Sequence, residues 1–112
     1  MSNLSKKRKD LIIDDKEYVM MFDMKSIDVF KEISGKSFLN SIALLDKYDD
    51  KTILEFMAST IRLKEDETNP LGMNLLKYDP IFLLLNYTHL VMELVFSSLP
   101  KAEENIKKKE IE

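Results

Sequence analysis

The sequence contains no cysteine, and this absence excludes several kinds of site at once. A disulfide framework, a thiolate zinc site and a cysteine nucleophile all need that residue. A chain without disulfides fits a reducing compartment, so we expect a cytoplasmic location. The net charge of −3 argues further against a general nucleic-acid binder, whose binding surface should be basic.

Glycine and proline are also scarce, with 2 and 3 among 112 residues. So few breakers favour helices with short joints over a many-turned β-sandwich. The length fits one domain, and the composition, 45% hydrophobic and 33% charged, is that of an ordinary globular protein. We predict a single domain over residues 11–100, between a flexible basic tail (1–10) and a charged tail (101–112) that is a frayed helix or disordered.

Two short apolar runs precede the helices and predict a β-hairpin. Leu11–Ile13 and Tyr18–Phe22 are rich in strand-forming residues, and polar residues 14–17 separate them. Both runs are apolar on both faces, which indicates helices on one side and a partner on the other. Met20 or Met21 should then lie on the outer face, where the adaptable methionine side chain suits a binding surface.

The remainder of the domain shows the signals of helices. Asp23 and Ser37 can each cap a helix, and Gly35 between them is a natural left-handed stop. The predicted helices span residues 24–34, 38–48, 51–61, 71–78 and 81–99. Together with the hairpin they predict an α+β fold, mostly α, with an N-terminal β-hairpin followed by four to five helices in one compact domain.

The segment between the third and fourth predicted helices is strongly charged. Residues 64–68 carry one lysine and three acidic residues, which predicts a surface loop. Asn69-Pro70 then forms a cap-then-proline signal for the start of the short helix.

The last predicted helix is nearly long enough to span a bilayer. At about 100° per residue, its polar residues fall on one narrow stripe formed by Asn86, His89, Glu93 and Ser97. A lone membrane helix has no use for such a stripe, whereas a helix in a small domain can turn it to water. We therefore predict a core helix and no membrane partner. Its apolar surface is wider than so small a domain can cover, which indicates a protein interface or self-association as a homo-oligomer.

No catalytic, metal or cofactor site is predicted. His89 and Glu93 lie one helical turn apart, but no nucleophile or second histidine completes a set, so we interpret them as a hydrogen-bonded surface pair. Adjacent acidic residues show no EF-hand spacing and are better explained as caps and loops. Gly35-Lys36-Ser37 matches only the end of a phosphate-binding loop, because Phe30 stands where that motif requires glycine.

One family shows a similar order of elements. A hairpin of the form apolar, Asp-x-Lys, apolar, Phe-Asp occupies residues 11–24, and the Gly35-Lys36-Ser37 joint follows the first helix. Residues 53–61 and 75–100 supply a middle helix and an apolar C-terminal half. Over about residues 11–100, this order resembles the tail assembly chaperones of long-tailed bacteriophages and prophages. The chain departs from the family at residues 69–72, where the family often has acidic residues, and in the basic run 6–9.

The resemblance implies a non-enzymatic chaperone in the cytoplasm of a bacterial host. Its partner would be the tape measure protein, a long helical chain that aggregates unless covered, with the tail tube protein as a further partner. We predict Met21, Phe82 and Leu90 on the interaction surface, because each sits off the best-defined core face. The alternative is a small nucleic-acid-binding regulatory protein, in which the hairpin and Lys6 to Lys9 contact the phosphates. The chain lacks the basic helix that this alternative would favour.

Overall fold

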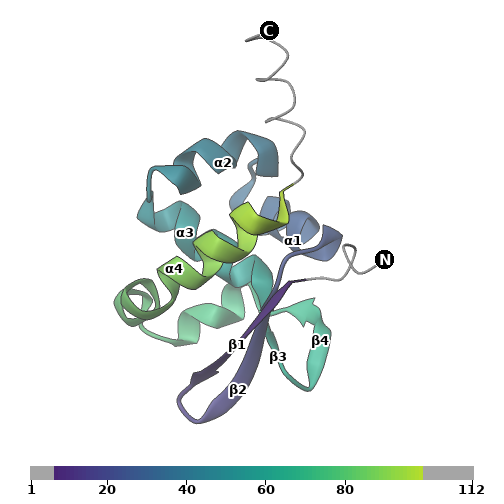
Figure 1. Ribbon diagram of the computed structural model, residues 1–112, viewed down its shortest axis with the longest axis vertical. Coiled ribbons are helices and arrows are strands. Elements are labelled where there is room, and N and C mark those ends of the chain that lie inside the picture. Colours follow the sequence, from purple (N-terminus) through teal and green to yellow (C-terminus); the bar gives the residue numbers. More distant parts are fainter. Residues whose placement is uncertain (1–6, 100–112) are drawn as a thin grey trace, which may run out of the picture.

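The computed structural model describes residues 7–99, which form an antiparallel sheet packed against helices (Figure 1). The sheet has the strand order β1-β2-β3-β4. The strands are β1 (Arg8–Ile13), β2 (Lys16–Met21), β3 (Ile61–Leu63) and β4 (Asp66–Pro70). The helices are α1 (Met24–Ser34), α2 (Phe38–Asp46), α3 (Asp50–Thr60), the 3-10 helix η2 (Gly72–Lys77) and α4 (Pro80–Ser98). The fold is thus α+β and mostly helical.

The N-terminal hairpin is confirmed and begins earlier than predicted. β1 starts at Arg8, so residues 8–10 belong to the sheet and not to a tail. Asp14 and Asp15 both have positive φ, which a tight two-residue turn requires. Residues 1–6 and 101–112, for which tails were predicted, lie outside the described residues.

A second hairpin replaces the predicted loop and helix start at residues 64–70, so that prediction is wrong. The chain leaves α3 at Ile61, whose backbone is extended, and Ile61 pairs with Met20 of β2. Pairing with a strand 40 residues earlier therefore overrides the local signals. Pro70 ends the edge strand β4, a position where its missing amide is tolerated.

The helix caps predicted at Asp23 and Ser37 are confirmed. The side chains of Asp23, Ser37 and Asp49 accept hydrogen bonds from backbone amides at the starts of α1, α2 and α3, and Asp79 does the same for α4. Gly35 adopts the left-handed conformation after α1, with φ of 73°. The short helix before α4 is a 3-10 helix with no side-chain cap.

The main core lies between one face of the sheet and helices α1, α3 and α4. Alternate residues of β1 and β2 point into it, among them Ile13, Tyr18 and Met20. Phe30 of α1 packs against Phe56 of α3 with ring centroids 4.4 Å apart. α4 lies alongside α3 (Figure 1) and buries four fully enclosed residues, Leu83, Val91, Leu94 and Val95.

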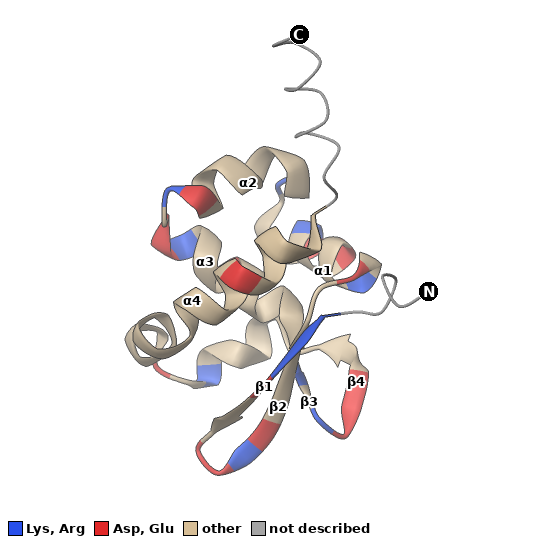
Figure 2. Ribbon diagram, in the orientation of Figure 1, with Lys and Arg blue, Asp and Glu red and all other residues tan. Residues whose placement is uncertain are grey.

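The polar stripe of α4 is exposed, as predicted, at all four of its positions. Glu93 is the one charged residue of α4, and the rest of the helix is tan in Figure 2. By length and composition alone α4 could cross a membrane, a test that the core helix of a soluble protein also passes. In the fold its inward face packs on the core cluster described above.

The buried Tyr18 gives the fold an expected sensitivity to alkaline pH. The Tyr18 and Tyr78 hydroxyls lie 2.5 Å apart, and burial followed by this hydrogen bond raises the pKa of Tyr18 well above its ordinary value. Above about pH 10 the unfolded chain loses this proton while the folded chain keeps it, so the free energy of unfolding should fall as pH rises, by up to about 1.4 kcal/mol per pH unit. Below about pH 9 the contribution is constant.

Urea unfolding between pH 8 and pH 11 measures this effect. Tyr18→Phe should make the alkaline decline shallower, whereas Tyr48→Phe, at a 60% exposed position, serves as the matched control. Equal slopes in the two variants would contradict the assignment to Tyr18.

Candidate protein interaction surface

The first turns of α4 present apolar side chains to solvent. Ile81, Phe82 and Leu85 are 65%, 40% and 80% exposed, and we call these three residues the α4 patch. They lie on the same side of the helix as the polar stripe but at its N-terminal end, so the outward face changes from apolar to polar along its length. Phe82 is held edge-on against Tyr87, with ring centroids 5.9 Å apart. These three exposed apolar residues make the start of α4 a candidate interaction site.

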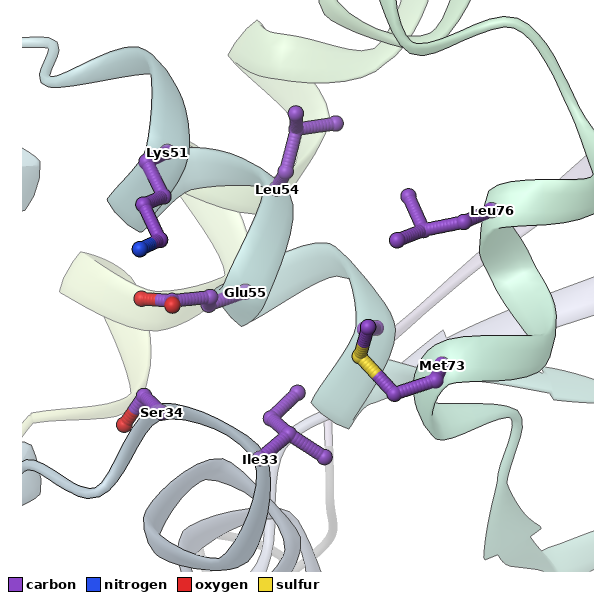
Figure 3. Close-up of a pocket in the computed structure, with 8 residues that line it drawn as sticks. Ile33, Ser34, Lys51, Leu54, Glu55, Met73 and Leu76 are labelled. Atoms are coloured by element: carbon purple, nitrogen blue, oxygen red, sulfur yellow. The ribbon is translucent and has the colours of Figure 1, made fainter.

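A groove lies between the end of α1, the middle of α3 and η2 (Figure 3). Its volume is about 320 Å³, and its lining is mostly apolar, with Met73 60% and Leu76 42% exposed. We call it the α1–α3–η2 groove. Its lining residues are Ile33, Ser34, Lys51, Leu54, Glu55, Ala58, Met73 and Leu76.

The structure does not bring the three predicted interaction residues together. Phe82 lies in the α4 patch, whereas Leu90 is half-buried and packs against the core. Met21 lies on the outer face of the hairpin, as expected for one of the two methionines, but it is only 8% exposed, and Met20 is fully buried on the inner face. The outer face carries a second buried layer, described next.

Arg62 fills the outer face of the sheet. It stands opposite Val19 in the register, and its side chain is 1% exposed. Its guanidinium donates hydrogen bonds to Asp23 Oδ1 at 2.6 Å, to the Ser26 hydroxyl at 2.8 Å and to the Glu67 carbonyl at 2.8 Å. These hydrogen bonds join β3 to the start of α1 and to β4.

Ion pairs across this face show that the sheet is curled. Arg8 of β1 binds the Glu67 carboxylate of β4 through two hydrogen bonds of 2.8 and 3.2 Å, and Lys64 donates to Asp10 at 3.1 Å. In a flat sheet, β1 and β4 would lie about 14 Å apart, beyond comfortable reach of one side-chain pair. The hydrogen bonds between Arg8 and Glu67 raise the pKa of the guanidinium and lower that of the carboxyl.

Two residues of the basic run, Arg8 and Lys9, are already paired with acidic groups. Arg8 binds Glu67, and the Lys9 ammonium lies 3.1 Å from Glu93 of α4. Glu93 is thus engaged by Lys9, and no hydrogen bond joins it to His89, contrary to the predicted surface pair. In the range 7–99, no group of three or more His, Cys, Asp or Glu residues is placed to hold a metal ion.

Sequence reasoning missed Leu85 and the α1–α3–η2 groove. Leu85 lies one turn after Phe82, so helical periodicity could have found it. The groove had no comparable signal, because the placement of η2 follows from the β3–β4 hairpin that the sequence did not reveal.

Comparison of the chain with protein-family models, with curated proteins and with solved structures gives no match. The resemblance to tail assembly chaperones therefore stays a prediction from residues 11–100. The class that the geometry itself defines is an α+β, mostly helical domain with an apolar surface at the start of its last helix.

Proposed function

We propose that the chain is a non-enzymatic chaperone of phage tail assembly, which binds the tape measure protein before the tail tube surrounds it. The observation that carries the proposal is the α4 patch, in which three apolar residues of one helix end are 40–80% exposed. A helical client that aggregates through its own apolar stripe needs a surface of this character as a temporary cover.

Strand pairing is a poor way for this chain to hold a client, which favours side-chain docking. The edge of β1 is blocked by α4, because the Tyr87 hydroxyl donates to the Ile12 carbonyl at 2.9 Å and Glu93 pairs with Lys9. The opposite edge, β4, is short and ends in Pro70. Both are ways by which proteins protect sheet edges from added strands.

Leu85→Asp is expected to reduce capture of the tape measure protein at least about tenfold, because a carboxylate would have to be buried in an apolar interface. The measurement is affinity capture of the tagged chain from cells that also produce the neighbouring genes, with quantitative mass spectrometry. Leu39→Asp on α2 is the matched control, since Leu39 is also a helical leucine and is 77% exposed.

Each outcome separates the proposals. Capture of a very long helical protein by the unchanged chain and by Leu39→Asp, but not by Leu85→Asp, supports the chaperone function through the α4 patch. Retention of nucleic acid that depends on residues 1–10 would favour the regulatory alternative. Capture of neither would count against both.

A further inference from the structure

The α1–α3–η2 groove has the size and lining of a slot for protein side chains. Its 320 Å³ lies at the lower limit of small-molecule pockets, which run from roughly 300 to 1,000 Å³. Ile33 of α1 and Leu54 of α3 face Met73 and Leu76 of η2 across the groove (Figure 3). Two or three apolar side chains fill such a space.

Glu55 places a hydrogen-bond acceptor at one end of the groove. Its side chain is 13% exposed, and its Oε1 atom is buried with no hydrogen-bond partner among residues 7–99. The Lys36 ammonium lies 3.8 Å from that oxygen, which is too far to donate a hydrogen bond. A hydrogen-bond donor stabilises a buried carboxylate oxygen, so this end of the groove favours a partner that supplies one.

We propose that this groove binds an amphipathic helix of the client, with apolar side chains between Ile33, Leu54 and Leu76 and a lysine or arginine that donates to Glu55. The inference rests on the proposed function for the identity of the client. A helix fits because apolar residues three and four apart emerge on one side of it, and the protected sheet edges leave strand addition unfavourable. A cationic donor fits because a hydrogen bond between two charged groups is stronger than a neutral one.

The test selects partners without assuming their identity. A displayed library of helical peptides is selected on the full-length chain, and the affinities of the enriched peptides are measured by calorimetry. We expect peptides with apolar residues three or four apart and a lysine or arginine one turn away. Glu55→Gln and Met73→Glu should each weaken their binding at least about tenfold, since removing one partner of a buried charge pair leaves the other without compensation.

Matched controls assign the effect to the groove. Leu39→Asp should bind the peptides like the unchanged chain, and circular dichroism checks that all variants are folded. Replacing the basic residue of a peptide by methionine should weaken its binding to the unchanged chain. For this altered peptide, Glu55→Gln should cause no additional loss of affinity. Peptides without a basic residue, no enriched peptides, or binding indifferent to Glu55→Gln and Met73→Glu would each overturn the proposal.

The two proposals fail separately. If the peptides behave as expected but no tape measure protein is captured from cells, the groove stands and the chaperone function fails. If the tape measure protein is captured in a way that depends on Leu85 but not on Glu55 or Met73, the function stands and the groove proposal fails.

Discussion

Arg62→Ala is expected to lower the free energy of unfolding by about 3–5 kcal/mol, the usual cost of breaking a buried ion pair from one side. The change removes a guanidinium that is 1% exposed, together with its hydrogen bonds to the Asp23 carboxylate. It also leaves the Glu67 carbonyl without its hydrogen-bond donor and opens space over Val19. For a domain whose total stability is about 5–15 kcal/mol, this loss is a large fraction.

Urea unfolding of the two chains, fitted with a common dependence on urea, measures the difference. Lys64→Ala is the matched control, because its ion pair with Asp10 joins side chains that are 42% and 65% exposed. Such a pair contributes about 0–1 kcal/mol. If the two variants lost equal stability, the buried hydrogen-bond network of Arg62 would contribute no more to the stability of the fold than the exposed ion pair of Lys64.

Phe56→Ala is expected to lower the free energy of unfolding by about 3–5 kcal/mol, because it leaves a cavity where three helices meet. The Phe56 ring is fully buried. Its centroid lies 4.4 Å from the ring centroid of Phe30 in α1 and 6.1 Å from that of Phe38 in α2. Since the outer side of α2 is exposed at Leu39 and Leu44, this aromatic cluster is a main attachment of α2 to the domain.

Thermal and urea unfolding followed by circular dichroism test this expectation. Leu39→Ala on the exposed side of α2 should change stability by no more than about 0.5 kcal/mol. A loss for Phe56→Ala below about 1 kcal/mol would show that the surrounding helices collapse into the vacated space.

The elements that the sequence predicted are those whose signals lie within a few residues. Asp23, Ser37 and Asp49 cap helices through bonds to amides three positions away, so each helix start is visible locally. The same holds for the exposed stripe of α4, which needs only the helical period. Phe82 was found for this reason.

What the sequence did not reveal depends on distant pairing. β3 has three residues, too few to show a period, and it exists because Ile61 and Leu63 pair with Met20 and Tyr18. The buried position of Arg62 opposite Val19 follows from the same pairing. The α1–α3–η2 groove depends on the same strand pairing, because η2 follows directly after β4.

The contact between α4 and β1 has a consequence for how the chain behaves at high concentration. An open edge strand recruits the strands of other copies and can seed fibrils, and here the Tyr87 hydroxyl and Glu93 hold α4 against that edge. The helix that carries the exposed apolar patch is therefore also the guard against polymerisation. A partner that binds α4 without moving it leaves the edge of β1 covered. A partner that displaced α4 would expose this edge, to which strands of other copies could add.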